Sequence, residues 1–491
     1  MSAVRSRTSK THPLQIAEIR SGPSLGRVGI TFCPGKKQAA GLTGAWDRDL
    51  QTDAERISRW GAAVVVTLVE QHELVLLEVT SLGKEIERRH MEWLHLPIAD
   101  VSIPVLAFER EWIRVGPGLR ARLRDGFDVL IHCKGGLGRA GMIAARLLVE
   151  LGWNLEAAIH AVRRVRPGAI ETSAQLEHVR RCAFVPEPRP SPEAASILDR
   201  AKGALVGLAV GDAVGTTLEF KPRDSYPLLT DMVGGGPFQL HAGEWTDDTA
   251  MALALGQSLV ENDGLDSADL MHRFVDWRDN GAYSCTGTCF DIGMTVSSAL
   301  NRWIRSGNPV AGSNDPMSAG NGSLMRLAPV ALRYWHNRDM LGKVAAEQSR
   351  TTHGAAEAIA ACVAFADMLA DAIEGRPRSE VLRPRRGSYP PAIGAIIAGS
   401  WRGKVRDEVQ SSGYAAHSLE AALWSVGRTA DFRSAILTAA NLGGDADTTA
   451  AITGQLAGAL YGLSGIPAEW LARLAWRERI DALAEHLASH A

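Results

Sequence analysis

The chain has 491 residues, of which 46% are hydrophobic and 22% are charged, a composition typical of soluble globular proteins. Its formal net charge of −2 argues against nucleic acid as a partner, and no apolar run is long enough to cross a membrane. The six cysteines are sparse and irregularly spaced, which indicates free thiols in a reducing compartment. We therefore expect a cytoplasmic protein.

Two segments of unusual composition divide the chain. Residues 1–13 carry the basic stretch "SAVRSRTSK", which lacks the apolar core of a secretory signal and predicts a disordered tail. Residues 185–196 lie in "FVPEPRPSPEAAS", whose four prolines predict an extended, semi-rigid linker. The linker separates two domains of plausible size, residues 14–184 and residues 197–491.

The first domain alternates short β-branched runs with amphipathic stretches. The runs "AAVVVTLV" (62–69) and "DVLIH" (128–132) predict strands, whereas 53–61 and 139–152 have helical periodicity. Strand followed by helix, repeated along the chain, predicts an α/β fold with parallel pairing.

The second domain is rich in Ala, Gly and Leu at helical spacing, as in residues 251–261 and 355–373, which predicts an all-α fold. In "KGALVGLAVGDAVG" a glycine recurs every four residues. Glycines at this spacing would leave one face of a helix without side chains, so that another helix could approach closely. They are Gly203, Gly207, Gly211 and Gly215.

The stretch "VLIHCKGGLGRAG" runs from an apolar strand into a helix that begins near Arg139. Backbone N–H groups collect at such a junction, and glycine allows several of them to face one anion. The same field stabilises a thiolate at Cys133, and Arg139 can grip two phosphate oxygens. The Gly-Lys-Ser/Thr ending of a nucleoside-triphosphate loop is absent. The expected phosphate-binding residues are Lys134, Gly135, Gly136, Leu137, Gly138 and Arg139.

His132, Cys133 and Arg139 form the His-Cys-x5-Arg signature of cysteine-dependent protein phosphatases. With "CPGKK", "HLPIADVSIP" and "RPGAIETSAQ", residues 14–182 resemble the kinase-associated branch of the dual-specificity phosphatases. The resemblance implies Cys133 as nucleophile, Arg139 as phosphate clamp, His132 as the residue tuning the thiolate, Asp100 as general acid and Gln175 as the residue positioning water. Asp100 could instead be an ordinary acidic turn residue.

This sequence departs from the family at Ala140, where most relatives carry Ser or Thr after the arginine. The hydroxyl of those relatives helps the thiolate leave the phosphoenzyme. We therefore expect slow turnover of the phosphoenzyme.

Two helix starts in the second domain are strongly acidic, "WTDDTAM" and "GGDADTTA". One such residue is enough to cap a helix, but each start presents three, and clustered carboxylates repel one another unless a cation neutralises them. Asp and Thr oxygens suit Mg²⁺ or Mn²⁺, and two such clusters could hold two ions about 3.5–4 Å apart. The expected metal ligands are Thr246, Asp247, Asp248, Asp445, Asp447 and Thr448.

These motifs, together with "GALVGLAVGDAVGTTLEF", "GNGSLMR" and "TTHGAAEA", resemble the ADP-ribosylglycohydrolases, including the enzyme that reactivates dinitrogenase reductase. The resemblance implies an all-α bundle around a dinuclear metal centre, with the six residues above as ligands. It also implies that Glu219 contacts the ribose or the catalytic water. The implied substrate-binding residues are Gly234, Gly235, Gly236, Gly320, Asn321, Gly322, Ser323 and His353. Glu219 could instead be an exposed helix-end carboxylate, and a lone histidine is often structural.

The sequence thus predicts a bifunctional hydrolase, in which a cysteine phosphatase precedes a metal-dependent ADP-ribosylhydrolase that cleaves the bond at C1″. The expected partners are a phosphorylated substrate and an ADP-ribosylated protein or a small molecule containing ADP-ribose, without membrane or nucleic acid. Two alternatives remain open. The first domain could only recognise phosphate for the second, or the second could act on another ribosyl substrate.

Overall fold

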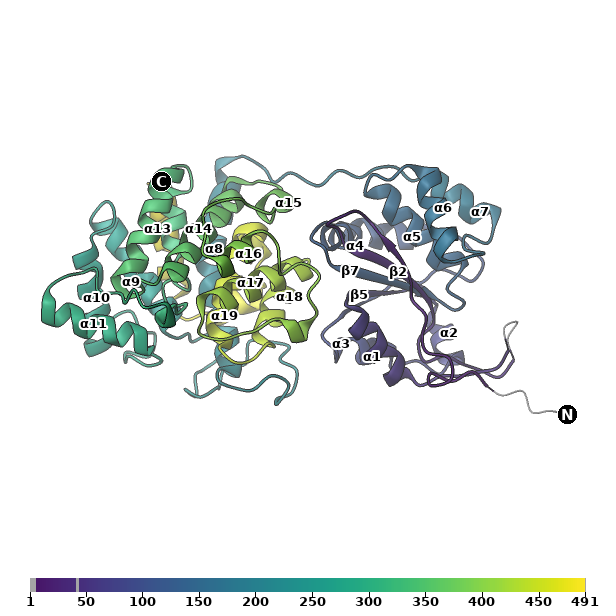
Figure 1. The fold of residues 1–491 in the computed structure, drawn as a ribbon, viewed down its shortest axis with the longest axis horizontal. Helices are drawn as coiled ribbons and strands as arrows, with labels where there is room; N and C mark the ends of the chain where they lie inside the picture. The colour runs from purple at the N-terminus through teal and green to yellow at the C-terminus, as the bar shows by residue number, and fades with distance from the viewer. Residues whose placement is uncertain (1–5, 41–43, 491) are drawn as a thin grey trace. The chain divides into compact units, whose positions relative to one another are not determined.

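The structure, a computed structural model, describes residues 6–40 and 44–490 (Figure 1). It divides into two compact units after Glu187, within the predicted linker. The first helix of the second unit already begins at Ala194, so the linker is shorter than the proline pattern predicts. All six cysteines are free thiols.

Residues 6–13 differ from the disordered tail that the sequence predicts. The backbone N–H of Arg7 donates to Ala45 at 2.9 Å, and its guanidinium lies 5.2 Å from the centre of the Trp46 ring. These tertiary contacts, which composition does not reveal, hold the segment in place. Residues 1–5 of the predicted tail lie outside the described residues.

The first unit has a five-stranded sheet of order β1-β2-β7-β5-β6, in which β1 is antiparallel to β2 and the other pairs are parallel. This confirms the predicted α/β fold. The strands are β1 (Ala17–Arg20), β2 (Arg27–Phe32), β3 (Lys37–Gln38), β4 (Trp46–Asp47), β5 (Ala62–Thr67), β6 (Glu92–His95) and β7 (Asp128–Cys133). The helices are α1 (Leu50–Trp60), α2 (Gln71–Leu76), α3 (Leu82–Glu87), α4 (Leu106–Arg124), α5 (Gly138–Glu150), α6 (Leu155–Val165) and α7 (Ser173–Arg180).

The sheet lies between two layers of helices (Figure 1). Because strand side chains alternate, Val129, Ile131 and Cys133 of β7 face the core formed with α4 to α7. Leu130 faces the other core, beneath α1 and α3. The strand pattern therefore places the Cys133 side chain on the face covered by α5.

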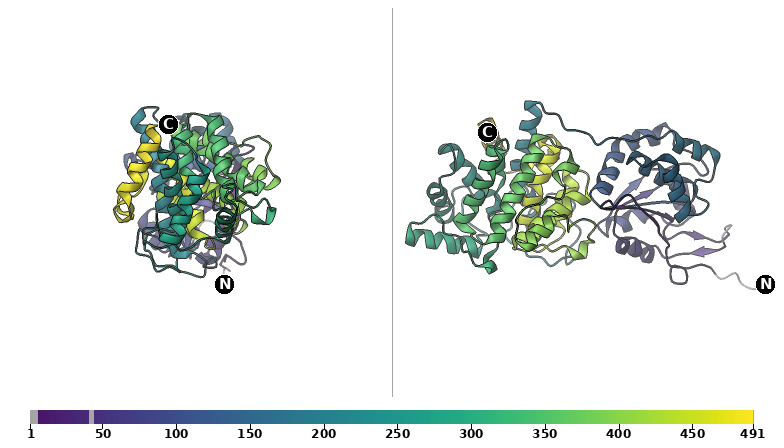
Figure 2. Two further views of the ribbon diagram at one scale, coloured as in Figure 1. Left: turned by 90° about the vertical axis from the view of Figure 1, so that its left-hand side faces the viewer. Right: turned by 45° about the horizontal axis from the view of Figure 1, so that its top comes forward.

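The second unit is helical, and Figure 2 shows it from two further directions. This confirms the predicted all-α fold. Its α-helices are α8 (Ala194–Gly215), α9 (Asp247–Glu261), α10 (Ser267–Asn280), α11 (Met294–Ser306), α12 (Ala328–Tyr334), α13 (Arg338–Thr352), α14 (Ala356–Glu374), α15 (Arg378–Val381), α16 (Pro391–Ile397), α17 (Ala415–Arg428), α18 (Phe432–Ala440), α19 (Ala446–Tyr461), α20 (Ala468–Arg473) and α21 (Arg477–Ser489). Short 3₁₀ turns are η1 (Thr216–Leu218), η2 (Pro316–Ser318), η3 (Arg406–Glu408) and η4 (Leu463–Gly465). No helix among the residues described is long and apolar enough to span a bilayer.

Helices α8 and α19 make the closest backbone contact at the centre of this unit. A methyl group at Gly207 would lie 2.3 Å from the carbonyl oxygen of Gly454, and one at Gly211 would lie 2.2 Å from that of Ala450. From the other side, a methyl group at Gly454 would lie 2.0 Å from the Gly207 carbonyl oxygen. Only helices without side chains at these positions can approach so closely, so the bare face that the sequence predicts is confirmed.

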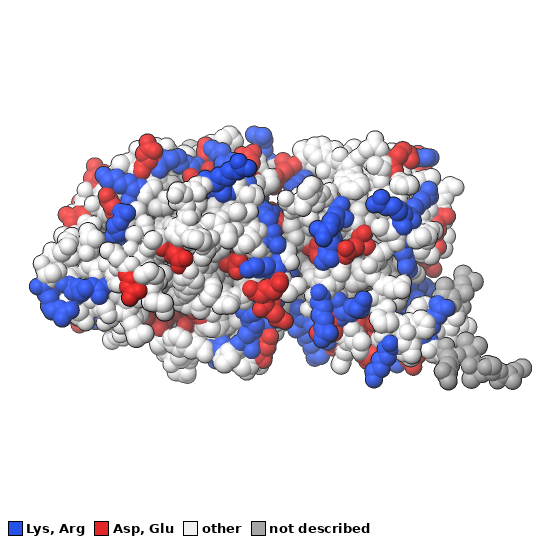
Figure 3. All heavy atoms as spheres, in the orientation of Figure 1, with Lys and Arg blue, Asp and Glu red and all other residues white. Residues whose placement is uncertain are grey.

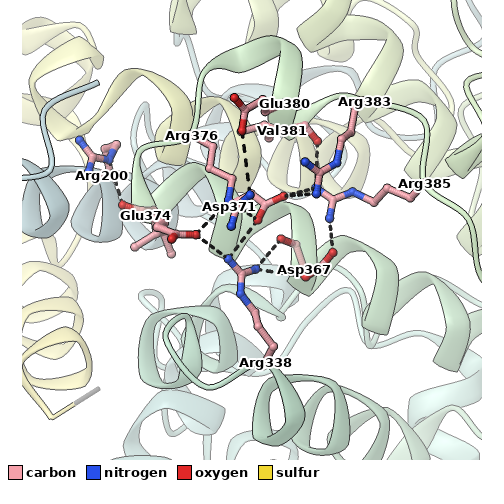
Figure 4. Close-up of polar contacts among 11 residues, drawn as sticks. Arg200, Arg338, Asp367, Asp371, Glu374, Arg376, Glu380, Val381, Arg383 and Arg385 are labelled. Atoms are coloured by element: carbon pink, nitrogen blue, oxygen red, sulfur yellow. Dashed lines mark hydrogen bonds and ion pairs between the residues drawn. The ribbon is translucent and has the colours of Figure 1, made fainter. Parts of the chain in front are cut away.

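Arginines also tie α13, α14 and the following loop together (Figure 4). Asp371 of α14 pairs with Arg338 of α13 at 3.0 Å, with Arg376 at 3.1 Å and with Arg385 at 2.6 Å. On the face shown in Figure 3, acidic and basic side chains are interspersed rather than gathered into a broad field of one sign.

The close contact of α8 and α19 generates a first prediction. Gly211→Ala should lower the free energy of unfolding by about 1–3 kcal/mol, because the methyl group has no room against the Ala450 carbonyl. Gly342→Ala in α13 is the matched control, since its nearest atom would lie 3.9 Å away. There alanine should stabilise the helix by about 0.5–1 kcal/mol. Thermal unfolding measures both, and equal effects of the two changes would contradict the helix-contact argument.

Candidate functional site

The Cys133 thiol lies where β7 ends, at the base of the loop that leads into α5. It is 3% exposed and accepts a hydrogen bond from the Gly136 backbone N–H at 3.2 Å. The loop residues expected to bind phosphate, 134–138, thus wrap around the thiol. Gly136 has φ +70°, and a methyl group there would lie 2.6 Å from the Thr31 carbonyl oxygen, so glycine is required.

Two cations outside the loop hold its carbonyl groups. Arg166 donates to the carbonyl oxygens of Gly135 and Gly136, each at 2.9 Å. Lys36 donates to the carbonyl oxygen of Lys134 at 3.3 Å, and burial lowers the pKa of Lys36 to about 8. With its carbonyl groups held this way, the loop can turn N–H groups toward the thiol, as Gly136 does, and toward an anion bound there. Both residues lie in quoted motifs, but only the fold shows their partners.

Arg139 is held by two carboxylates. Its guanidinium donates to both oxygens of Glu73 at 2.5 and 2.9 Å and pairs with Asp100 at 2.8 Å. The carboxylates differ in exposure, since the side chain of Glu73 is 5% exposed and that of Asp100 is 54% exposed. The buried partner fixes the guanidinium, whereas Asp100, the predicted general acid, pairs with it from the exposed side.

Sequence reasoning missed Glu73. Its only local signal is the capping box of α2, in which the Glu73 side chain accepts from the backbone N–H of Glu70 at 2.9 Å. Burial raises the pKa of Glu73, but the bonds from Arg139 and from the Glu70 backbone outweigh burial and lower it overall. The carboxylate therefore stays charged beside the arginine.

His132 and Gln175 are both fully buried. His132 Nε2 lies 2.7 Å from Thr67 Oγ1, which accepts from Trp93 at 2.8 Å, and burial lowers the pKa of His132 to about 3. Gln175 donates to the Ser102 carbonyl oxygen at 3.2 Å, on the loop that carries Asp100. The structure thus brings the predicted residues of this site together around one loop.

The six predicted metal ligands also converge, at the adjoining ends of α9 and α19. Thr246 Oγ1 lies 3.2 Å from Asp248 Oδ2 and 3.4 Å from Asp447 Oδ2, although 201 residues separate Thr246 from Asp447. Thr448 Oγ1 lies 3.4 Å from the same Asp248 oxygen. Asn321 donates to Asp445 at 2.6 Å.

This cluster has the donor set of a hard cation. Oxygens of Asp212, Asp248 and Asp447 lie within 4.8 Å of one another, as do oxygens of Glu219, Asp445 and Asp447. Asp248 Oδ1 is buried without a hydrogen-bond partner among the described residues, which fits a position facing a cation. Carboxylate and hydroxyl oxygens suit Mg²⁺ or Mn²⁺.

Burial and mutual repulsion both act on these carboxylates. Burial first, and neighbouring carboxylates second, raise the pKa of Asp212 and of Asp445 to about 7. The same causes raise the pKa of Asp247, of Asp248 and of Glu219 well above the ordinary range. So many buried acids are unfavourable without a positive charge among them.

Two further carboxylates belong to the cluster, and sequence reasoning missed them. Asp212 accepts hydrogen bonds from the backbone N–H of Thr246 at 2.9 Å and of Thr249 at 3.0 Å, which anchors the start of α9 to α8. Asp291 has φ +60°, and burial together with Asp247 raises its pKa to about 11. The strained backbone at Asp291 is typical of a functional position, but no local pattern announces it.

A cavity of about 700 Å³ opens beside the acidic cluster. Its lining includes the carboxylates of Glu219, Asp247 and Asp291 and the imidazole ring of His353. Glu219 is 3% exposed, not an exposed helix-end group, and accepts from the N–H of Ala446 at 2.7 Å. Other predicted residues that line the cavity are Gly320, Asn321, Gly322, Asp445, Asp447 and Thr448.

The remaining predicted substrate residues, Ser323 and residues 234–236, are not among the residues that line the cavity. Ser323 is buried, and its Oγ lies 2.8 Å from Ser349 Oγ. Residues 234–236 all have positive φ, and Thr217 Oγ1 donates to the Gly234 carbonyl oxygen at 3.0 Å. That glycine run packs on the turn before Glu219 and is not part of the cavity lining.

The fold and the two sites define a cysteine-phosphatase-like domain joined to a helical domain that contains a buried acidic cluster. Residues 193–491 match the family model described as ADP-ribosylglycohydrolase, and residues 45–179 match that of a Swiss Army Knife protein, DSP-PTPase phosphatase domain. The chain belongs to the ADP-ribosylglycohydrolase family. It is a fusion of a dual-specificity-type phosphatase domain with a hydrolase-like domain of that family, which confirms both resemblances.

Known proteins resemble the second domain at different levels. ADP-ribosylarginine hydrolase Tri1 of Pseudomonas putida is 48% identical over 326 residues, which cover 66% of this chain and 85% of that protein. ADP-ribosyl-[dinitrogen reductase] glycohydrolase of Rhodospirillum rubrum is 36% identical over 307 residues. The alignment covers 59% of this chain and 96% of that protein. A solved structure described as an ADP-ribosylglycohydrolase-related protein complex is 42% identical to this chain, with a TM-score of 0.54. The match covers 60% of this chain and 98% of the chain in that structure.

The repulsion within the acidic cluster generates a second prediction. Asp248→Asn should raise the melting temperature of the metal-free protein by about 2–4 °C, because the amide replaces a buried acid whose charged form is disfavoured by burial and by its neighbouring carboxylates. The same change should reduce the further increase that Mn²⁺ produces, because one ligand is lost. Asp276→Asn on the exposed face of α10 is the control and should change neither value. A lower melting temperature of metal-free Asp248→Asn would refute the repulsion argument.

Proposed function

We propose that this chain is a bifunctional hydrolase, a cysteine-dependent phosphomonoesterase fused to a metal-dependent ADP-ribosylarginine hydrolase. The observation that carries the second activity is the acidic cavity, in which Glu219 and Asp291 lie beside the cluster at the ends of α9 and α19. The 48% identity with a protein named ADP-ribosylarginine hydrolase supports arginine as the acceptor.

The metal centre would consist of two Mg²⁺ or Mn²⁺ ions. The residues that would hold them are Thr246, Asp247, Asp248, Asp445, Asp447 and Thr448. When bound, such ions orient hydroxyl groups and water and stabilise developing negative charge. Asp212 would keep Thr246 in place, because its carboxylate accepts hydrogen bonds from both the backbone N–H and the hydroxyl of Thr246, each at 2.9 Å.

The protein's own groups suit hydrolysis at C1″ of an ADP-ribosyl arginine. The carboxylates that line the cavity attract the cationic guanidinium of the acceptor. Glu219 is fixed by the N–H groups of Ala446 and Asp447, at 2.7 and 3.3 Å, so one of its oxygens can orient water or a ribose hydroxyl. Water adds to C1″, the bond from C1″ to the guanidine nitrogen breaks, and that nitrogen takes up a proton.

In the phosphatase domain the Cys133 thiolate would attack phosphorus while Arg139 and the loop N–H groups bind the phosphoryl oxygens. Asp100 would protonate the leaving oxygen and then accept a proton from the water that hydrolyses the phosphocysteine. Gln175 would position that water, because its side chain is tied to the loop of Asp100. Glu73 would keep Arg139 oriented in both steps.

Ala140 favours one second candidate. Without a hydroxyl next to Arg139, the first domain could bind phosphate and deliver targets to the hydrolase without turnover. A further candidate keeps the metal centre but takes a ribosyl group other than ADP-ribose. Measuring phosphate and ADP-ribose release from a phosphotyrosine peptide and an ADP-ribosylarginine protein separates all three.

A third prediction concerns the nucleophile. Cys133→Ser should reduce phosphate release by at least about 10³-fold, because a serine hydroxyl stays protonated at neutral pH. ADP-ribose release should be unchanged in this variant and should be lost on chelation, whereas chelation should leave phosphate release intact. Cys182→Ser, a half-buried cysteine in the same domain, serves as control and should retain phosphatase activity. Unchanged phosphate release by Cys133→Ser would eliminate the phosphatase assignment.

A fourth prediction concerns the departure at Ala140. With no hydroxyl to aid the leaving thiolate, rapid-quench kinetics should show a burst of product followed by slower turnover. Ala140→Ser should shrink the burst and raise the steady rate by up to about tenfold, the worth of one hydrogen bond. A linear time course for the wild-type protein would show that the missing hydroxyl does not limit turnover.

A further inference from the structure

Arg326 is a fully buried arginine whose hydrogen bonds go to uncharged groups. It lies just before α12, and burial lowers its pKa to about 9. Its donors go to neutral groups of α13, namely Gln348 Oε1 at 3.0 Å, the Gln348 carbonyl oxygen at 3.0 Å and Thr352 Oγ1 at 2.9 Å. No ion pair joins Arg326 to a carboxylate within residues 6–40 and 44–490. A buried charge held only by neutral acceptors is costly, which points to a specific use.

The hydroxyl of Thr352 connects this arginine to His353. Thr352 Oγ1 accepts from Arg326 Nη2 and lies 2.8 Å from His353 Nδ1. Within the described part of the chain, that ring nitrogen is the one acceptor in reach of the hydroxyl proton. A hydroxyl proton directed at Nδ1 requires a lone pair on that nitrogen, which places the ring's own proton on Nε2.

The Nε2 edge of His353 faces the cavity. The ring is 2% exposed, and Nε2 has no hydrogen-bond partner among the residues that the structure describes. A methyl group at Gly320 would lie 3.2 Å from Nε2, and one at Gly322 would lie 3.1 Å from it. Both glycines line the same cavity, so the loop leaves this edge of the ring open to a ligand. Burial, and the charge of Arg326, lower the pKa of His353 to about 3, which keeps the ring neutral.

We propose that Arg326 and Thr352 fix His353 as its neutral Nε2–H tautomer, so that the ring donates a hydrogen bond to an acceptor oxygen of the ADP-ribosyl group. This inference rests on the proposed hydrolase function. Arg326 and Thr352 act as positioning residues, because they reach the ligand only through the ring. A ligand with a diphosphate needs donors, yet the carboxylates that line this cavity can only accept. The opposite tautomer would present a lone pair to those oxygens.

The first experiment reads the tautomer directly and needs no ligand. Long-range ¹H–¹⁵N NMR spectra of the full chain, labelled at histidine, should show His353 with its proton on Nε2. Thr352→Val removes the hydroxyl and should shift the ring toward a mixture of tautomers, whereas Thr352→Ser retains the hydroxyl and should preserve the wild-type signal. A proton on Nδ1 in the wild-type protein, or an unchanged tautomer in Thr352→Val, would overturn the relay.

The second experiment measures the affinity of the Mn²⁺-loaded chain for free ADP-ribose by calorimetry. Thr352→Val should weaken binding by about tenfold, the worth of one hydrogen bond to an anion, and Thr352→Ser should restore most of it. Thr351→Val is the matched control, since Thr351 Oγ1 also lies 3.3 Å from Arg326 but does not contact His353. Equal losses in Thr352→Val and Thr351→Val would refute the role of the ring.

The histidine itself allows one more comparison. In His353→Gln the amide nitrogen reaches the position of Nε2, whereas in His353→Asn it reaches only that of Nδ1. His353→Gln should therefore bind ADP-ribose several-fold more tightly than His353→Asn, and the reverse order would contradict a donor at Nε2. If the wild-type chain bound no ADP-ribose, both the proposed hydrolase function and the assignment of this ligand would be refuted. The NMR experiment would still test whether Arg326 and Thr352 fix the tautomer of His353.

Discussion

The close approach of α8 and α19 is the constraint on which the second unit and its acidic cluster depend. Glycine at matching positions of both helices brings their backbones into contact, with the Gly211 position facing the carbonyl of Ala450. The acidic groups follow from this geometry, because Asp212 lies within that contact on α8 and Asp447 lies at the start of α19. A larger side chain in the contact would separate the two helices and, with them, the two halves of the acidic cluster.

The acidic cluster lowers the stability of the metal-free protein through the same carboxylates that the proposed activity requires. Burying carboxylates side by side raises their pKa values and destabilises the metal-free protein, yet the same carboxylates suit a hard cation. Backbone N–H groups at the helix starts reduce this cost, as where Glu219 accepts from Ala446. The acidic residues are thus held in part by backbone N–H groups of the surrounding helices.

Residues that carry chemistry in local motifs were predictable from the sequence, and residues that act through distant partners were not. Cys133 and Arg139 share one loop, and Asp247 begins a helix, so spacing and residue type identify them. Glu73 reaches Arg139 across 66 residues, and only the fold brings the two together. Asp291 belongs to the cavity through a left-handed backbone conformation that no periodicity signals. The strand and helix classes were predictable because hydrophobic periodicity is local, whereas the contacts of residues 6–13 are tertiary.

The charged groups around the two sites have opposite signs. Around Cys133, Arg139 and Arg166 add positive charge to the loop N–H groups, and the resulting field favours an anion without a metal. Around Asp247 the field is negative, which favours a cation and the guanidinium of an acceptor but repels a diphosphate. Under the proposed function such a cavity needs neutral donors at its other wall. A buried histidine whose proton is fixed by a neighbouring hydroxyl would supply one without adding a positive charge beside a bound metal.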